Sequence, residues 1–425
     1  MNGCSRRSPG RLALWTLTLT LLLSAPQAAV AEESNKLKVK ATTELQLGVL
    51  YDDNAALGRR GQFGADQVYD VTSVLGVNSR IQTDLRDTIR FVLTGKLRSE
   101  EGRWRQYLRN TDVQLKPSFE FDVSKNLTLT PSLSFKLHRE TEEIWGYLEF
   151  TPSLSFILYT TKGLVIEGGY DFKATLYDSN ELTNTYANVD QLSHLAKLKV
   201  KIWAHKKLRL SVKAEVEHQS FGDNIEEKLA DIMFLPIEQF EDPNKVAVPW
   251  KRKDLFVRGE LSALFLAHKY VGIAIGYNVE YDHSNIDAFD AFSHGPRLAA
   301  VLATKKHEAF VEGRLSFYDF MHFRFDTRYE DTRKDLKLEA FGSYAYKITD
   351  AWKVGLKVTF LSNFSNDALT NADGSFRFDP RHSRSYSRYQ GTRIEAMLSY
   401  TWDTQTGEAP KKPEPRIPGT IMAQR

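Results

Sequence analysis

The amino-acid sequence predicts an all-β fold, a transmembrane antiparallel β-barrel of about sixteen strands, with about 14 to 18 strands compatible with the pattern. Three observations lead to this prediction. Apolar and polar residues alternate along most of the chain, the connections between the alternating segments are short and long in turn, and no apolar run is long enough for a transmembrane helix. A large soluble β-sandwich or solenoid, which would also alternate, is the remaining alternative.

The N-terminus has the features of a cleavable secretory signal. Arg6, Arg7 and Arg11 form a basic region, the apolar run LALWTLTLTLLL (12–23) contains about a dozen residues, and small residues precede Glu32. Such a run is too short to cross a bilayer. We therefore expect residues 1–31 to be a signal peptide that takes the chain across the inner membrane.

Removing that segment changes the charge and thiol content of the chain. Residues 1–31 contain three arginines and no acid, which leaves 57 less 3, or 54, basic residues against 54 acidic ones. A formally neutral protein gives no electrostatic reason to expect a nucleic-acid partner. The one cysteine, Cys4, is also removed, so we expect neither disulfides nor thiolate chemistry in the exported protein.

The segments in which apolar and polar residues alternate are long. In LRLSVKAEVE (208–217) every second residue is apolar, and the others are charged or polar. Strands of soluble sheets usually contain about five or six residues, whereas a tilted strand that spans a bilayer needs about nine to eleven. Comparable segments are 37–49, 112–121, 164–173, 196–202, 310–317, 336–346 and 352–360.

The connections define the order of the strands. Short turns are expected at 82–87, 124–126, 160–163, 204–207, 266–269, 304–307 and 348–351. Longer polar loops are expected near 52–66, 99–105, 139–143, 178–186, 222–253, 282–295, 319–335 and 363–388. Short periplasmic turns and longer outer loops are typical of bacterial outer-membrane barrels, and the residues 322–329 are the segment that most readily extends a strand instead.

The last predicted strand, GTRIEAMLSYTW (391–402), completes this pattern. The chain resembles Gram-negative outer-membrane β-barrels, porin-like ones in particular, over about residues 36–402. The resemblance implies that Gly391, Tyr400 and Trp402 form the sorting signal read by the outer-membrane assembly machinery. The chain differs from that class because it continues, and we expect a barrel over 32–402 followed by a disordered periplasmic tail, rich in proline and charge, over 403–425.

A phrase with proline inside a strand occurs three times, as LKPSFEF, LTPSLSFKL and FTPSLSFIL. Proline cannot donate to a strand ladder. With hairpins centred on Ser124 and between Thr141 and Glu142, Pro117, Pro131 and Pro152 form one row on the outer face of neighbouring strands. We expect this row to weaken the ladder locally, unless the phrase is simply a tolerated strand sequence.

Two groups of residues are candidates for function. The first is a set of charges predicted to face a polar lumen, where mixed charge influences ion and solute selectivity or simply keeps the interior wet. Its members are Lys197, Lys199, Lys201, Arg209, Lys213, Glu215, Arg258, Glu260, Glu312, Arg314, Lys353 and Lys357.

The second group lies on the two longest predicted loops. The acidic loop 222–253 contains an apolar segment, IMFLPI, and the loop 363–388 is rich in arginine. The hypothesis is that the first loop folds inward as a lid and pairs with the second; two independent surface loops are the alternative. The gating candidates are Met233, Phe234, Leu235, Glu238, Arg377, Arg381 and Arg384.

We expect no enzymatic activity, metal site or cofactor. Asp282, His283 and Ser284 are consecutive, and adjacent side chains of an extended segment point apart, which does not suit a catalytic triad. The acids of YDDN (51–54) and of 282–290 lack the spacing of a calcium loop.

The predicted function is an outer-membrane pore for hydrophilic solutes or ions. One alternative is the outer-membrane component of an export system, for example for polysaccharide, with the tail binding periplasmic partners. Another is a surface-binding barrel that transports nothing. The other expected partners are outer-membrane lipid and the assembly machinery.

Overall fold

The computed structural model describes residues 38–52, 70–102, 110–140, 146–160, 163–177, 190–221, 253–285, 290–320, 334–365 and 389–405. These residues form a closed antiparallel β-barrel, as the sequence predicts. No helix long and apolar enough to cross a membrane occurs within those ranges. Predictions about residues 1–31, the outer loops and the tail after Gln405 lie outside the described residues.

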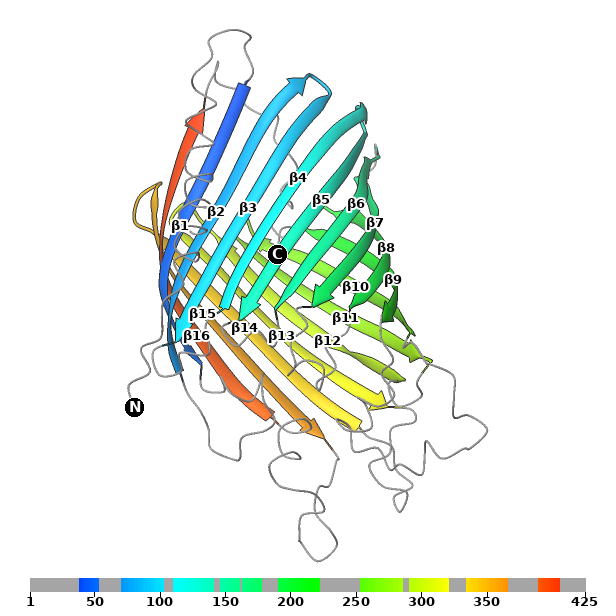
Figure 1. Cartoon of the computed structure of the whole chain (residues 1–425). Helices are drawn as coiled ribbons and strands as arrows, with labels where there is room; N and C mark the ends of the chain where they lie inside the picture. The colour runs from blue at the N-terminus through cyan, green and yellow to red at the C-terminus, as the bar shows by residue number, and fades with distance from the viewer. Residues whose placement is uncertain are drawn as a thin grey trace, which may run out of the picture.

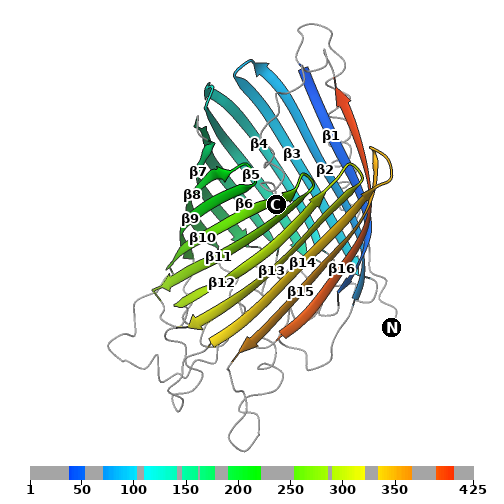
Figure 2. The same cartoon turned by 180° about the vertical axis from the view of Figure 1, so that it is seen from behind.

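The barrel contains sixteen strands, each paired with its neighbours in chain order, and β16 pairs with β1 to close it. Figures 1 and 2 show opposite walls of this barrel, with β1 and β16 side by side. The strands are β1 (Lys38–Asp52), β2 (Asp70–Arg86), β3 (Ile89–Gly102), β4 (Asn110–Ser124), β5 (Leu127–Glu140), β6 (Tyr147–Tyr159), β7 (Leu164–Tyr177), β8 (Gln191–His205), β9 (Leu208–Phe221), β10 (Lys253–His268), β11 (Val271–Ser284), β12 (Ala291–Ala303), β13 (His307–Phe320), β14 (Lys334–Lys347), β15 (Trp352–Ser365) and β16 (Tyr389–Gln405).

All seven predicted short turns are confirmed, and longer connections alternate with them. The connection predicted at 282–295 is shorter, because β12 already begins at Ala291, where Phe292 and Ser293 continue the alternation. The last strand runs to Gln405 rather than ending at Trp402. The predicted loop 319–335 joins β13 and β14 and leaves the strand count at sixteen.

Hydroxyl side chains stabilise the short turns. The Oγ of Ser124 accepts a hydrogen bond from the backbone N–H of Leu127 at 3.2 Å, and the Oγ1 of Thr304 accepts one from His307 at 2.8 Å. The Oγ1 of Thr349 does the same for Trp352 at 3.0 Å. Such bonds replace backbone contacts where the chain reverses. Gly163 before β7 has a φ of 72°, a conformation that side chains with a Cβ rarely adopt.

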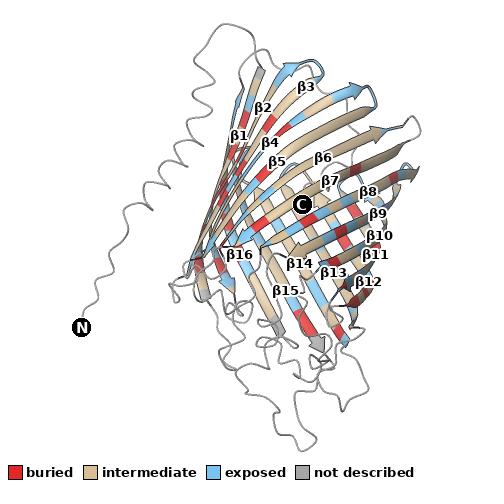
Figure 3. Cartoon of the chain, turned by 45° about the vertical axis from the view of Figure 1, so that its right-hand side comes forward, coloured by how far each residue is buried: buried red, intermediate tan, exposed pale blue. Residues whose placement is uncertain are grey.

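The two faces of the wall differ in chemistry. Large apolar side chains on the outer face are exposed, including Leu261 at 61%, Ile275 at 62% and Leu298 at 57%. Figure 3 shows how exposed and buried residues are distributed over the strands. A continuous exposed apolar surface of this kind suits the hydrocarbon layer of a membrane rather than water.

The predicted single row of prolines is wrong. Ser118 pairs with Ser132 on β5, which places Pro117 opposite Leu133, and Leu133 pairs with Pro152 on β6. Pro131 pairs instead with Leu154, two residues along the strand. The error arises because each hairpin is centred one residue later than assumed. The three prolines are therefore staggered, and the β4–β5 pairing is interrupted next to Pro117 and Pro131.

Candidate functional site

The inner face of the barrel is the candidate site. Side chains at alternate positions point to opposite faces, so the exposed outer residues Leu198, Val212 and Leu261 fix the inner face of β8, β9 and β10. Val311 and Leu356 do the same for β13 and β15. All the predicted lumen charges lie at inner positions: Lys197, Lys199, Lys201, Arg209, Lys213, Glu215, Arg258, Glu260, Glu312, Arg314, Lys353 and Lys357.

Ion pairs join the inner faces of β7 and β8, and another lies on the inner face of β9. The Nζ of Lys197 lies 2.7 Å from the Oδ2 of Asp171, and Lys201 pairs with Glu167. On β9, the Nζ of Lys213 lies 2.7 Å from the Oε1 of Glu215. The two β7–β8 pairs join diagonal residues of neighbouring strands, whereas Lys213 and Glu215 lie two residues apart on the same face of β9.

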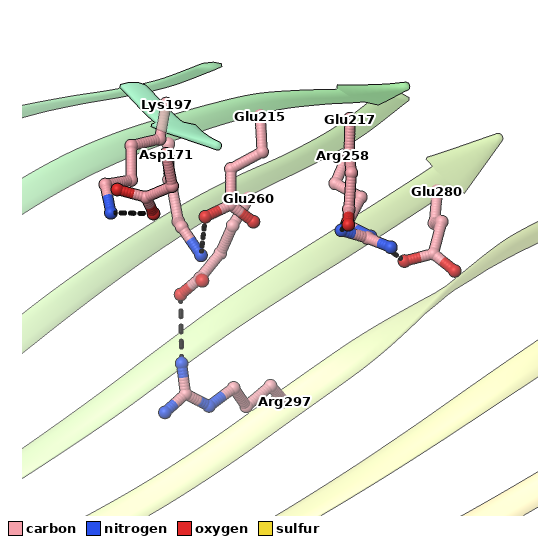
Figure 4. A network of polar contacts seen from close by, with 9 residues as sticks. Asp171, Lys197, Glu215, Glu217, Arg258, Glu260, Glu280 and Arg297 are labelled. Atoms are coloured by element: carbon pink, nitrogen blue, oxygen red, sulfur yellow. Dashed lines mark hydrogen bonds and ion pairs between the residues drawn. The ribbon is translucent and has the colours of Figure 1, made fainter. Parts of the chain in front are cut away.

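Arg258 on β10 continues the network in both directions. Its Nη1 lies 2.7 Å from Glu217 Oε2 on β9, and its Nε lies 2.7 Å from Glu280 Oε2 on β11. Glu217 also accepts a hydrogen bond from the Oγ of Ser193 at 2.6 Å. The guanidinium group thus joins three strands, as Figure 4 shows.

Arg297 on β12 extends the network to β13. Its Nη1 lies 3.0 Å from Glu260 Oε1, across β11, and its Nη2 lies 2.8 Å from Glu312 Oε2. Arg314 lies 3.6 Å from Glu312 and 3.9 Å from Glu339 on β14. We name the ion pairs of β7–β14 the charged belt. The charged belt covers the inner face of eight of the sixteen strands, and in it cations and acids lie next to one another.

A second group of charges, which the sequence analysis missed, crosses the closure of the barrel. Arg98 on β3 lies 2.8 Å from Glu100 and 2.9 Å from Glu395 on β16. Arg393 lies 2.7 Å from Glu100. We name these four residues the seam cluster. Their alternation indicates inner positions, but their proximity follows only from the pairing of β16 with β1, of β1 with β2 and of β2 with β3.

The remaining predicted lumen residues have different surroundings. Lys353 lies 3.7 Å from Glu44 on β1, and Arg209 lies over the ring of Trp203, 5.7 Å from its centroid. Lys199 forms no ion pair with another described residue, and the residue opposite it on β9 is Lys213, which has the same charge.

The predicted assembly residues lie on β16. The ring of Tyr400 lies 4.8 Å from that of Trp352 and 5.9 Å from that of Trp402, close to the short-turn end of the barrel. Gly391 lies at the opposite end of the strand. Aromatic residues at that level are typical of a membrane interface.

The predicted gating residues, Met233, Phe234, Leu235, Glu238, Arg377, Arg381 and Arg384, lie outside the described residues. Asp282, His283 and Ser284 occupy consecutive positions of β11, so their side chains alternate between the faces. Within the described ranges, no group of three or more His, Cys, Asp or Glu residues is arranged to hold a metal ion.

No protein-family model matches the chain, and no curated protein matches it significantly. Several solved structures have a similar fold. OmpT of Vibrio cholerae, an outer-membrane protein, is 10% identical with a TM-score of 0.45, covering 87% of this chain and 99% of its own. OccK5 of Pseudomonas aeruginosa is 8% identical with a TM-score of 0.46, covering 86% and 98%.

A structure described as a bacterial polysaccharide outer membrane secretin is 11% identical with a TM-score of 0.45, covering 85% of this chain and 98% of its own. Similarities this low assign neither substrate nor activity. The fold is established by the strand pairing, and the chain is a closed sixteen-stranded antiparallel barrel with an apolar outer wall, the architecture of porin-like outer-membrane proteins.

Proposed function

We propose that this barrel is an outer-membrane pore through which hydrophilic solutes or ions pass. The observation that carries the proposal is the charged belt, which places ionised side chains on the inner face of β7–β14 while the outer face is apolar. Charged groups need water or close partners, and a polar interior behind an apolar wall is typical of water-filled barrels. Sixteen strands are also wide enough for an aqueous channel.

The proposal places the protein in the outer membrane, embedded by its apolar wall, and assigns it passage rather than catalysis. A signal peptide over residues 1–31 and insertion by the assembly machinery through Gly391, Tyr400 and Trp402 complete the proposal. Export of polysaccharide with periplasmic partners and surface binding without transport are its competitors. They differ from it in what they predict for conductance.

The experiment is a single-channel recording of the purified, detergent-folded barrel in a planar bilayer. We expect steady conductance steps, and a reversal potential in a salt gradient that shifts in Lys197→Gln. Lys206→Gln, in the β8–β9 turn, removes the same charge outside the lumen and should leave the reversal potential unchanged.

Three outcomes separate the functions. Conductance from the full chain supports an open pore. Conductance that starts only when residues 222–252 are deleted supports a gated exporter, and truncation of 406–425 should then abolish binding of its periplasmic partner. A barrel that stays silent in both forms contradicts the proposal and favours surface binding.

A further inference from the structure

Three inner cations lie beside one another on β2, β3 and β4, away from the charged belt. Thr94 of β3 pairs with Arg80 on one side and with Lys116 on the other. Lys96 is the next inner residue of β3 and pairs with Asn78 and Gln114. We name Arg80, Lys96 and Lys116 the basic patch.

The ion pairs of the same strands fix the direction of these side chains. Arg90 and Glu120, which pair across β3 and β4, form an ion pair at 2.8 Å. Arg98 reaches Glu395 across the barrel closure and must therefore point inward. Lys96 and Lys116 share the face of these residues, and both are exposed, as side chains that border an aqueous lumen should be.

The acids near the basic patch already have cations. Glu120 pairs with Arg90, Glu100 and Glu395 pair with Arg98, Asp112 lies 3.9 Å from Lys136 and 2.9 Å from His138, and Glu44 lies 3.7 Å from Lys353. The residues that pair with the patch are neutral: Thr42, Asn78, Thr94 and Gln114. Within the described ranges, none of the three cations has an ion-pair partner.

This arrangement costs free energy unless an anion is present. Paired strands lie about 4.8 Å apart, so the three side chains start within roughly 10 Å of one another. Like charges at this spacing repel, and the repulsion is only partly screened by salt. A carboxylate or phosphate group placed among them accepts charge-assisted hydrogen bonds from a guanidinium and two ammonium groups.

We propose that the basic patch binds the anionic group of a solute, a carboxylate or a phosphate, during its passage through the lumen. The inference rests on the proposed pore function and specifies its substrate class. Each cation of the charged belt has an acid beside it and contributes little net field at a distance, and Lys199 of β8 is a single cation without an ion pair to another described residue. The basic patch gathers three such cations on neighbouring strands, so we expect it to contribute to anion selectivity.

The test is isothermal titration calorimetry of the detergent-folded full chain at low ionic strength, with citrate and with inorganic phosphate as separate probes. We expect saturable binding of at least one probe, weakened tenfold or more by the triple change Arg80→Gln, Lys96→Gln and Lys116→Gln. The control changes Lys125, Lys206 and Lys269 to Gln, in short turns, and removes the same net charge without altering the lumen wall.

The two probes distinguish carboxylate from phosphate recognition. Wild-type protein that binds neither, or a triple variant that binds as tightly as the control, overturns the inference. Should the triple variant fail to fold, the single changes Lys96→Gln and Lys116→Gln should each weaken binding several-fold, and unchanged affinity in both overturns it as well.

Bilayer recordings separate this inference from the proposed function. Wild-type protein that binds citrate but conducts no current refutes the pore and leaves the patch as an anion site. If the wild-type protein conducts and the triple variant has the same anion-to-cation permeability ratio, the patch is refuted and the pore remains.

Discussion

Gly295 shows how closely one residue position is constrained in this wall. A Cβ atom at this position of β12 would lie 1.8 Å from the carbonyl oxygen of Leu315 on β13. The neighbouring residue is Pro296, and the β12–β13 pairing is interrupted between His294 and Arg297. Glycine is needed here because the two backbones approach each other where proline cannot donate to the ladder.

Gly295→Ala should therefore destabilise the barrel. Because the backbone of β13 has to move, we expect a loss of roughly 1–3 kcal/mol, the range typical of overpacking. The measurement is the urea midpoint of unfolding in detergent, followed by tryptophan fluorescence. Gly313→Ala on β13 is the matched control, since nothing lies within 4 Å of its Cβ position; equal midpoints for the two variants would contradict the prediction.

At the scale of the strands, the seam cluster joins elements that are not neighbours in the sheet. Arg98 on β3 reaches Glu395 on β16 across β1 and β2. The side chains of Glu395 and Glu100 are only 9% and 13% exposed. An acid this little exposed loses much of its hydration, so its ion pair matters more than one at a wet surface.

Replacing Arg98 by Met should lower the free energy of unfolding by roughly 1–3 kcal/mol, because the poorly hydrated Glu395 loses its ion pair with Arg98, while Glu100 keeps only Arg393. Heat-modifiable migration of the folded barrel on a gel gives the melting temperature. Arg90→Met is the control, since its partners Asp84 and Glu120 are 46% and 28% exposed, more than the acids of the seam cluster, and we expect a smaller shift there. If Arg90→Met lowered the melting temperature more than Arg98→Met, the seam cluster would not contribute more to stability than an exposed ion pair.

The strands themselves were predictable from the sequence, and the contacts between distant strands were not. Alternation and turn residues act over a few positions, which is why all seven short turns and the inner face of Lys197 and Glu312 follow from local pattern. Register depends on the centre of each hairpin, and an error of one residue displaced Pro131 by two positions. The seam cluster and the basic patch require three-dimensional neighbours, so neither could be found by reading along the chain.

At the scale of the whole molecule, the apolar wall determines where the barrel resides. Leu261 lies in the middle of β10 and is 61% exposed on the outer face. Leu261→Arg places a charge at the level of the hydrocarbon, which costs about 2–4 kcal/mol near the bilayer midplane. We expect this loss in denaturant titrations of the barrel folded into phospholipid vesicles.

Leu261→Phe keeps the position apolar and should change stability little. If Leu261→Arg were tolerated as well as Leu261→Phe in vesicles, the outer face of β10 would not contact lipid. That outcome would point to a protein partner on this side of the wall.

The pairing of β1 with β16 has a consequence for how the chain folds. Lys40 pairs with Gln405, so this contact joins the two ends of the barrel, while every other strand pair is joined by one turn or loop. Contacts of such high contact order form slowly, because the entropy of closing the chain is lost before they are made. Until that step, β1 and β16 are open edges able to pair with another chain. A factor that shields both edges until the last step would thus keep them from pairing with another chain, and the seam cluster, which exists only after closure, reports that the step is complete.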